Sequence, residues 1–472
     1  MTGNCLMGFA ELALSLGARR FSFAGCDEGF SSVCVDSRKA GPGSLFIALR
    51  GGSDDGHRFV EAAFDGGAAG AMVDAAKLED RSLDLTGLAK NRGRELMAVE
   101  NTLSGLQNAA RAYLDKFPRL IRIGITGSAG KTTVKEIAAK VISREKETVM
   151  NEGNLNSETG LPLSVFAVRE HHEAGIFEMG MNRRGEIEEL AGVLRPHIAL
   201  VTGTGTAHIG ILGSREAIAE EKKNIFSRFT GSQKALIPCD DDYRDFLARD
   251  VKGKVIFYGR DSFAELGAVR DLGLEGAEII WEGKAVRFAL PGAYNVRNVL
   301  GALAIAKQVP VSGRAVREGL AMVRPLFGRG EIFPGPVTVI RDCYNASPES
   351  VAQVLAFCDG LGWRGRRVYV IGSMLELGSV SKEAHGVLGR LLAASGADMV
   401  FLFGGETEAA AAELEASSAK PEAGVSWFHT NDFEELSRAL EDYVRPGDLV
   451  LLKGSRGCAL ERLSGVLAKG AA

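Results

Sequence analysis

The segment 126–133 is the part of the sequence that most clearly indicates chemistry. It reads Thr-Gly-Ser-Ala-Gly-Lys-Thr-Thr and lies between an expected strand at 121–125 and an expected helix at 132–143. A glycine-rich loop in that setting turns backbone N–H groups and the positive end of the helix toward a phosphate. Its lysine would contact the β- and γ-phosphates, and the hydroxyl that follows would bind Mg²⁺. We therefore expect nucleotide binding by Gly127, Ser128, Ala129, Gly130, Lys131, Thr132 and Thr133.

The loop is a shorter variant of the full phosphate-binding pattern, because Ile125 stands where that pattern has its first glycine. The sequence contains no NKxD-type guanine motif and no clear apolar run that ends in aspartate ahead of a switch loop. These observations argue against a GTPase switch and against a motor. They favour chemistry on an acceptor that binds beside the nucleotide.

Three polar residues farther along the chain are candidates for the same site. Glu178 ends an expected strand, and open α/β sheets bind their ligands at the carboxyl edge of the strands. Its carboxylate is either a hard oxygen ligand for Mg²⁺ or an exposed acid at a strand end. His208, in a loop after the next strand, is either a ligand or a structural histidine. Lys222, on an expected helix at 214–229, by itself indicates only a solvated face.

Polar clusters also follow two strands of the C-terminal part. One contains Asp342, Tyr344 and Asn345, and the other, which is basic, contains Lys453, Ser455 and Arg456. Both clusters are explained either as ordinary turns or as an anion-binding site. An N-terminal loop adds Ser37 and Arg38, and an arginine is suited to forked contact with phosphate.

The elements that must position these residues indicate an α/β protein of three domains. Short strands and helices alternate up to residue 98, and an amphipathic helix then spans 102–117. Apolar runs followed by helices continue to Pro325, and a second series of strands and helices occupies the rest. We predict a small α/β domain at 1–98, a central domain with a P-loop-type, mostly parallel sheet at 99–325, and a Rossmann-like domain at 326–472.

The composition of the 472 residues, 46% hydrophobic and 25% charged, is that of a globular protein and excludes a disordered or fibrous chain. The net charge of −4 provides no basic field for nucleic acid or a membrane surface. No apolar run reaches the ~18 residues that span a bilayer, and the N-terminus has no basic leader region, so we expect a cytoplasmic monomer. Seven scattered cysteines without a CxxC pair argue against disulfides and zinc.

Taken in order, these motifs resemble those of the Mur ligase family across nearly the entire chain. The N-terminal pieces DSR, PGSLFIAL and DGHRF resemble a UDP-binding domain, and TGSAGKTTVKE resembles the family's ATP loop. The segments NEGNLNSETGLP, FEMGMNRRGEI, AHIG and EEKKNIF resemble those around its metal site. The segments PGAYNVRN, DCYNASPES, SMLELG and KGSRG resemble its nucleotide and acceptor loops.

The resemblance implies an ATP-dependent, ADP-forming ligase of peptidoglycan precursor synthesis. In such a ligase ATP converts the terminal carboxylate of UDP-MurNAc-tripeptide to an acyl phosphate, which the amine of D-alanyl-D-alanine attacks. The DNPR-type motif of ligases that add the third amino acid is not found, which favours addition of the dipeptide. The alternatives are a third-residue ligase, more remotely a folylpolyglutamate synthetase, and a binding protein that hydrolyses ATP slowly as a switch.

The resemblance also implies a role for each candidate residue. Lys131, one Mg²⁺ between Thr132 and Glu178, and a second Mg²⁺ near His208 would cancel the repulsion between the carboxylate and the γ-phosphate. A carbamate on Lys222 would provide a further carboxylate for the second metal. Adenine and ribose would face Asn295, Asn298, Arg329 and Asp342, the uridine diphosphate Ser37 and Arg38, and the dipeptide or acyl phosphate Tyr344, Asn345, Lys453, Ser455 and Arg456.

Three positions depart from the family's pattern. Tyr294 stands where the family more often has His, and Ser373 stands where an Asp is usual. Asn224 stands where Glu commonly follows the modified lysine. These departures bear on the details of nucleotide contact more than on the reaction.

Overall fold

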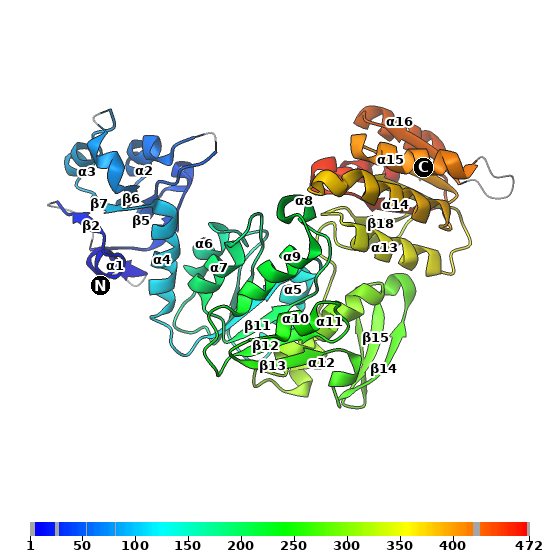
Figure 1. Cartoon of the computed structure of the whole chain (residues 1–472), viewed down its shortest axis with the longest axis horizontal. Coiled ribbons are helices and arrows are strands. Elements are labelled where there is room, and N and C mark those ends of the chain that lie inside the picture. Colours follow the sequence, from blue (N-terminus) through cyan, green and yellow to red (C-terminus); the bar gives the residue numbers. More distant parts are fainter. Residues whose placement is uncertain (1–4, 24–27, 53, 81, 419–424, 470–472) are drawn as a thin grey trace.

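The computed structural model of the chain describes residues 5–23, 28–52, 54–80, 82–418 and 425–469. Three α/β units follow one another along an open arc. Figure 1 shows the N-terminal unit at one end of the arc, the C-terminal unit at the other end and the middle unit between them. The expected mixed α/β fold with largely parallel sheets is confirmed.

The first unit is built on a five-stranded sheet in the order β2-β7-β6-β5-β4. All neighbours in it are parallel except β2, which is antiparallel to β7. Its strands are β2 (Arg19–Phe21), β4 (Ser32–Cys34), β5 (Ser44–Ile47), β6 (Gly70–Asp74) and β7 (Glu95–Val99). Around the sheet lie α1 (Phe9–Leu16), α2 (Val60–Asp65) and α3 (Leu85–Arg92), and β1 (Met7–Gly8) pairs with β3 (Gly29–Phe30).

Helix α4 (Thr102–Leu114) belongs to both the first and the middle unit. Its N-terminus is capped by the Asn101 side chain, which accepts from the Ser104 N–H at 3.0 Å. Its buried residues join one continuous apolar core that runs from α1 to helices α6 (Gly160–Val165) and α7 (Glu186–Leu194). The Tyr113 hydroxyl adds a hydrogen bond to the Val168 carbonyl at 2.7 Å. The helix therefore packs the two units together.

The middle unit contains a fully parallel six-stranded sheet in the order β13-β12-β11-β8-β10-β9. Alternate residues of β11 enter two different cores, as the strand period of two requires. Ile198 and Leu200 pack on the side of α5, α11 and α12, whereas Ala199 and Val201 pack on the side of α7 and α9. The strands are β8 (Ile121–Thr126), β9 (Thr148–Met150), β10 (Ala174–Glu178), β11 (Ile198–Val201), β12 (Lys234–Pro238) and β13 (Lys254–Tyr258). The helices are α5 (Lys131–Ile142), α8 (Ile209–Leu212), α9 (Arg215–Lys223), α10 (Arg244–Ala248), α11 (Ala293–Ala306) and α12 (Gly313–Ala321).

A small antiparallel sheet is inserted between β13 and α11. It is formed by β14 (Leu266–Asp271), β15 (Ala277–Trp281) and β16 (Lys284–Phe288). Trp281 and Phe288 are almost fully buried in the core that also contains α5 and α11. The insertion therefore covers the side of the middle unit that carries α12.

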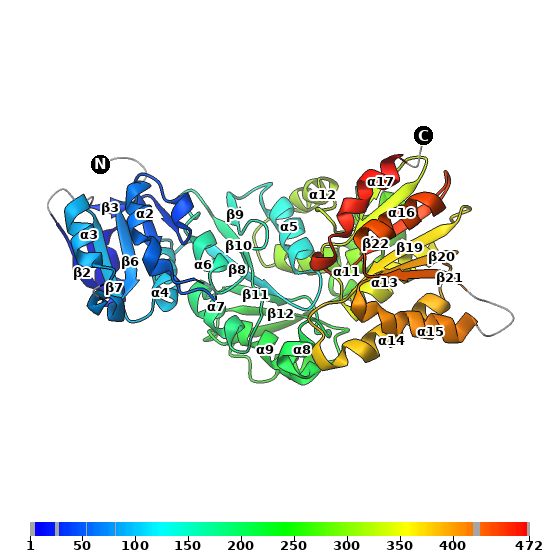
Figure 2. The same ribbon diagram turned by 90° about the horizontal axis from the view of Figure 1, so that it is seen from above.

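The C-terminal unit contains a six-stranded sheet in the order β17-β18-β22-β19-β20-β21, parallel except for the edge strand β17. Its strands are β17 (Glu331–Phe333), β18 (Thr338–Asp342), β19 (Arg367–Gly372), β20 (Met399–Phe403), β21 (Ser426–Thr430) and β22 (Leu449–Lys453). Helices cover both faces, as Figure 2 shows. They are α13 (Pro348–Gly360), α14 (Ser381–Ala393) and α15 (Glu408–Ser418) on one face and α16 (Phe433–Tyr443) and α17 (Ser464–Lys469) on the other.

One expected helix is shorter than its sequence pattern. The helix expected at 214–229 ends at Lys223, and a 3₁₀ turn follows at Asn224–Phe226. Ile225 and Phe226 are both buried, and the tighter turn lets two consecutive side chains enter the core. Among the described residues, no helix is both long enough and apolar enough to cross a membrane.

The cysteines have mixed environments. Cys34, Cys343, Cys358 and Cys458 are buried and free, Cys239 is half-buried, and Cys5 is exposed. The expectation that the cysteines are unpaired packing residues is met in the buried four. Cys26 lies outside the described residues.

Candidate active site

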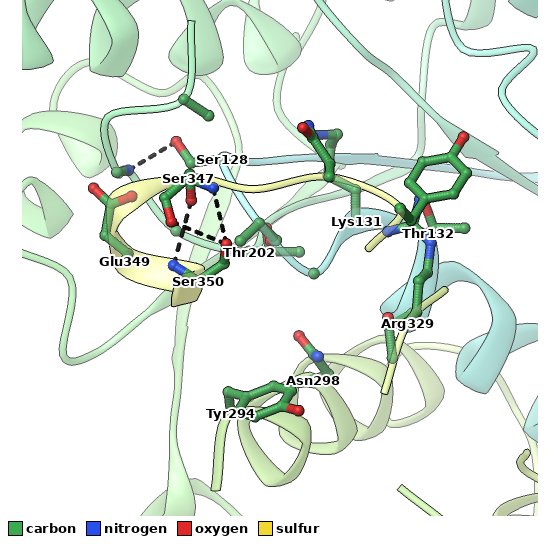
Figure 3. Close-up of a pocket in the computed structure, with 18 of the residues that line it drawn as sticks. Ser128, Lys131, Thr132, Thr202, Tyr294, Asn298, Arg329, Ser347, Glu349 and Ser350 are labelled. Atoms are coloured by element: carbon green, nitrogen blue, oxygen red, sulfur yellow. Dashed lines mark hydrogen bonds between the residues drawn. The ribbon is translucent and has the colours of Figure 1, made fainter. Parts of the chain in front are cut away.

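A cavity of about 500 Å³ lies between the middle and C-terminal units. Its walls come from the glycine-rich loop, the loop after β11, the start of α11 and the carboxyl ends of β18 and β22. Figure 3 shows Lys131 and Thr132 at the glycine-rich loop, Tyr294 and Asn298 on α11, and Arg329 beside them. Most of the residues that the sequence singled out for nucleotide and acceptor binding therefore meet in one place.

The glycine-rich loop joins β8 to α5 in a conformation that requires glycine. Gly127 and Gly130 have φ of 150° and 80°. A Cβ at Gly127 would collide with Thr202, and one at Gly130 would collide with Asn298. The Lys131 ammonium donates to the Gly127 carbonyl at 2.8 Å, and burial lowers the pKa of Lys131. The loop and its lysine thus form a compact, positively charged cradle at the start of a twelve-residue helix.

Glu178 is buried at the end of β10, so it is not an exposed strand-end acid. One carboxylate oxygen accepts from the Thr132 hydroxyl at 2.7 Å, and the other accepts from the Asn156 amide at 2.7 Å. The Glu178 backbone N–H donates to the Asn151 side chain at 2.9 Å. Asparagines from the loop after β9 therefore hold this carboxylate against the hydroxyl that begins α5.

The loop after β11 is fixed from both sides. Gly203 accepts from the Ser128 N–H at 2.9 Å, and Gly205 donates to the Ser128 hydroxyl at 2.8 Å. Asp241, in the loop after β12, accepts from the Thr204 N–H at 2.7 Å. These bonds place the loop against the phosphate cradle.

His208 lies at the end of that loop and contacts the C-terminal unit. Its Nδ1 is 3.1 Å from a carboxylate oxygen of Glu376, and hydrogen bonding from His208 lowers the pKa of Glu376. Both residues have left-handed backbone, with φ of 67° and 68°. Close by, Gly210 and Gly378 cross so tightly that a Cβ on either one would strike the backbone of the other. His208 is thus held at a junction between units.

Lys222 is fully buried on α9, so the interpretation as a solvated face is wrong. The helix turns this residue inward together with Ile218 and Ala219. Among the described residues, its Nζ has one hydrogen-bonding partner, the sulfur of Met181 at 3.9 Å. Burial, with the nearby charge of Lys131, lowers the pKa of Lys222 well below its usual value. The lowered pKa favours the neutral amine, and Lys222 is not among the residues that line the cavity.

The first two turns of α11 provide three polar side chains, those of Tyr294, Asn295 and Asn298. Asn295 donates to the Pro291 carbonyl at 2.8 Å and accepts from the Asn298 amide at 3.1 Å. The Tyr294 hydroxyl is buried without a hydrogen-bonding partner among the described residues. Burial, together with the charge of Asp342, raises the pKa of Tyr294 well above its usual value.

The C-terminal unit brings its own polar group to the cavity. The Lys453 ammonium, at the end of β22, donates to Asp342 and to the Asn345 carbonyl, both at 2.8 Å. The Arg329 guanidinium stacks on the Tyr344 ring, 3.9 Å from its centre. All five residues line the cavity.

Several candidates lie outside the cavity. Ser455 accepts from the Leu375 N–H at 2.9 Å, and Arg456 is exposed and pairs with Glu461 at 2.7 Å. Gly127 contributes its carbonyl, described above, rather than a wall. Ser37 and Arg38 lie in the first unit, on a separate part of the molecule (Figure 1). The roles of all five residues stay predictions.

Several residues that organise the cavity were not predicted from the sequence. Glu349, at the start of α13, accepts from the Thr206 N–H at 2.7 Å across the two units. Asn156, Asp241 and Glu376 hold other walls, as described above. Three of them lie inside motifs named above: Asn156 in NEGNLNSETGLP, Glu349 in DCYNASPES and Glu376 in SMLELG. Their position in those loops was the sequence signal that could have identified them.

The chain matches three domain families. They are the Mur ligase family, catalytic domain, at residues 30–113, the Mur ligase middle domain at residues 125–306, and the Mur ligase, glutamate ligase domain, at residues 328–456. The cavity is bordered by residues of the second and third matches.

Named relatives match the chain over nearly its full length. It is 42% identical to the UDP-N-acetylmuramoyl-tripeptide–D-alanyl-D-alanine ligase of Treponema pallidum over 98% of this chain and 99% of the relative. The ligase of the same name from Bacillus subtilis is 32% identical over 91% and 92%.

Crystal structures agree with the sequence relatives. A structure of MurF from Acinetobacter baumannii superimposes with a TM-score of 0.83 at 26% identity, over 98% of both chains. MurF from Thermotoga maritima in complex with ADP superimposes with a TM-score of 0.77 at 26% identity, over 93% of this chain and 97% of that chain. With these matches and the cavity built from its motifs, the chain belongs to the Mur ligase family.

Proposed function

We propose that this chain joins D-alanyl-D-alanine to UDP-N-acetylmuramoyl-tripeptide in an ATP-dependent, ADP-forming reaction of peptidoglycan precursor synthesis. As a member of the Mur ligase family it is an ATP-dependent ligase. The observation that carries the choice of substrates is the 42% identity, over 98% of the chain, to a ligase named for them. The cavity supports it, because nucleotide and acceptor candidates share one space.

The chemistry requires two anions to approach each other. A carboxylate oxygen attacks the γ-phosphorus as the bond to ADP breaks, and the neutral amine of the dipeptide then attacks the acyl carbon as phosphate leaves and a proton is released. Lys131 and the N-terminus of α5 would neutralise the phosphates. Asn295, Asn298, Arg329 and Asp342 would hold the nucleoside, and Tyr344, Asn345, Lys453, Ser455 and Arg456 would face the dipeptide or acyl phosphate.

The residues at the cradle fit magnesium. The carboxylate of Glu178 is buried, and its described hydrogen bonds come from the neutral groups of Thr132 and Asn156. A hard oxygen donor in that setting suits a divalent cation. Thr132 and Glu178 would hold one ion, and His208 with modified Lys222 a second. Mg²⁺ bound there would cancel phosphate charge and polarise the transferred group.

The surroundings of Lys222 also favour a carbamate on its side chain. Only a neutral amine adds to carbon dioxide, which forms an N–C bond and releases a proton. The lowered pKa of Lys222 favours the neutral amine, and the contact to Met181 leaves the nitrogen without a strong hydrogen-bond acceptor. The product would carry two carboxylate oxygens beside the cradle.

The first domain would bind the UDP end of the substrate. Arg38 is exposed and forms a forked pair with Asp36, donating from Nε and Nη2 at 2.9 and 2.8 Å. A diphosphate would compete for that fork, with Ser37 beside it. We thus assign UDP-substrate binding to 1–98, ATP binding to 99–325 and ligation to 326–472. We propose that the chain acts as a monomer in the cytoplasm, where ATP and UDP-linked substrates are made.

The proposed function is tested by phosphate release from ATP with purified chain. We expect release with UDP-MurNAc-tripeptide plus D-alanyl-D-alanine, and none when either is omitted. Release with the UDP-dipeptide and a single amino acid would instead indicate a third-residue ligase, and release independent of acceptors would indicate a switch. Lys131→Ala should abolish release, whereas Lys140→Ala, an exposed lysine on the same helix, should not.

A further inference from the structure

A short turn connects the middle unit to the C-terminal unit and carries Arg329 between two glycines. Gly328 and Gly330 have φ of 65° and 73°, a region that residues with a Cβ rarely adopt. The Arg329 N–H donates to the Leu326 carbonyl at 2.9 Å, which closes the turn. The local sequence thus lets the chain reverse sharply, but two flexible glycines alone do not fix where the arginine points.

Glu331 supplies the missing restraint. Its carboxylate accepts from the Gly328 N–H at 2.6 Å and from Nε and Nη2 of Arg341 at 2.8 and 2.9 Å. Glu331 begins β17, and Arg341 is its cross-strand partner on β18. The carboxylate therefore ties the turn to the sheet of the C-terminal unit through three charge-assisted or backbone bonds.

Arg341 is itself held in one orientation. Its guanidinium lies 4.6 Å from the ring centres of both Phe327 and Phe333. Hydrogen bonding to Glu331 raises the pKa of Arg341, so the guanidinium stays charged. Two aromatic faces and a forked carboxylate leave this group little freedom to rotate.

The opposite side of the turn faces the cavity. The Gly328 carbonyl accepts from the Tyr344 N–H at 2.9 Å, and Arg329 stacks on the ring of that same tyrosine. Arg329 lines the cavity together with the glycine-rich loop, and its charge contributes to the lowered pKa of Lys131. Gly328 is therefore bonded through its N–H to Glu331 and through its carbonyl to the loop that borders the cavity.

We propose that Glu331 is a positioning residue for nucleotide binding: with Arg341 as its anchor, it fixes the Gly328–Arg329–Gly330 turn so that the Arg329 guanidinium is presented to the bound nucleotide. This inference rests on the proposed function for the use of ATP in the cavity. Glu331 acts through Arg329 and does not line the cavity itself.

The first test is the affinity of Glu331→Gln for ADP, measured by calorimetry on the full chain, together with the KM values for ATP and the dipeptide. We expect the affinity for ADP to fall and the KM for ATP to rise by roughly tenfold, since residues coupled through one network interact by that order. The KM for the dipeptide should rise less than the KM for ATP, because the turn contacts the proposed dipeptide residues through Tyr344. Arg341→Gln should reproduce this pattern from the other side of the pair.

A double-mutant cycle separates positioning from a general loss of structure. In an Arg329→Ala background, Glu331→Gln should have little further effect on ADP affinity, because the group that it positions is gone. Glu331→Asp, which keeps the charge, should recover part of the wild-type affinity.

Asp448 provides a matched control in the same sheet. Its carboxylate accepts from Nε and Nη2 of Arg366 at 2.9 and 2.7 Å and from the Arg445 N–H at 2.8 Å, three residues earlier, as in the Glu331 arrangement. It precedes β22, at the amino edge of the sheet away from the cavity. Asp448→Asn should lower the melting temperature without changing ADP affinity at a temperature where it is folded.

The inference is overturned if Glu331→Gln and Asp448→Asn change ADP affinity equally, or if the loss caused by Glu331→Gln persists in full without Arg329. ADP titration needs no acceptor. An intact effect on ADP affinity in a chain that fails to ligate the dipeptide would therefore contradict the proposed function and leave this inference supported.

Discussion

Lys222 is a buried lysine whose surroundings disfavour its charged form, which suits the carbamate proposed for it. A lysine deep in the middle unit, next to sulfur and near Lys131, is unfavourable as a cation. Its conversion to an anion would instead place a negative group near a positive one. Burying this amine without a strong hydrogen-bonding partner costs folding free energy, which favours a functional role for Lys222 over a stabilising one.

Lys222→Ala should abolish ligation, with partial rescue by high concentrations of short carboxylic acids, because these can fill the space and supply carboxylate oxygens. Phosphate release with both acceptors present is the measurement. Lys223→Ala, which removes the neighbouring cation from the ring of Phe246, should retain activity. Wild-type activity in Lys222→Ala would contradict the carbamate.

Tyr294→Phe should leave the free energy of unfolding without nucleotide unchanged or raise it by up to about 1 kcal/mol, since it removes a buried hydroxyl that lacks a partner. Denaturant unfolding of the ligand-free chain measures this. A clear decrease in that free energy would mean that the hydroxyl has a partner in solution.

At the scale of elements, the loop after β19 is shaped by one buried histidine. His385, on α14, accepts from the Met374 N–H through Nε2 at 3.0 Å, and its Nδ1 is 2.8 Å from the Ser381 carbonyl. That loop continues to Glu376, which contacts the middle unit. Burial lowers the pKa of His385, although the hydrogen bond with the Ser381 carbonyl and the charge of Glu406 oppose the shift.

Acidification should therefore destabilise the chain through His385. Because the folded pKa lies below the unfolded value near ~6.5, the unfolded state binds more protons as pH falls through that value, and the loss ends at the folded pKa. The free energy of unfolding should fall as the pH is lowered across this window. In His385→Gln this part of the pH dependence should be absent, and an unchanged slope would exclude the histidine as its source.

Much of this architecture was predictable from local pattern. Strands such as β8 and β22 are buried between helices on both faces, so they are apolar along most of their length, and their polar followers mark the carboxyl edge. The edge strands β2 and β21 were not expected, because their residues are largely exposed or half-buried and form no apolar run. Whether a strand lies at the edge of a sheet depends on how the strands pair, so the sequence of the strand indicates it only weakly.

Some residues of the candidate site could likewise be predicted from local sequence, and others could not. The glycine-rich loop lies within one strand–helix connection, so its spacing alone predicted a nucleotide site. Glu178 ends a single strand, and its position left a Mg²⁺ ligand and an exposed acid as alternatives. Glu349 and Glu376 act on a loop of another unit, more than a hundred residues away. Such contacts depend on how the units dock, which no local pattern encodes.

At the scale of the molecule, the three proposed ligand sets lie on three units of an open arc (Figure 1). Reaction requires the carboxylate, the γ-phosphate and the amine to come within ~3.5 Å of one another with water excluded. The middle and C-terminal units already share a cavity, whereas the proposed UDP contacts lie in the first unit.

Small-angle scattering should show a smaller radius of gyration when nucleotide and UDP-substrate are both bound than when the chain is free. Nucleotide alone should give a smaller decrease, because its proposed contacts lie on two units only. Identical scattering with and without both ligands would contradict closure on binding.

The shared helix α4 has a practical consequence for anyone who divides the chain. Its apolar residues complete the interior of the first unit on one side and shield α6 and α7 on the other. A cut at residue 98 would expose apolar core residues of the N-terminal fragment that α4 covers. A cut after residue 114 would expose apolar residues of α6 and α7 in the C-terminal fragment. Only one fragment of any such pair can keep the helix, so the other should be prone to aggregation.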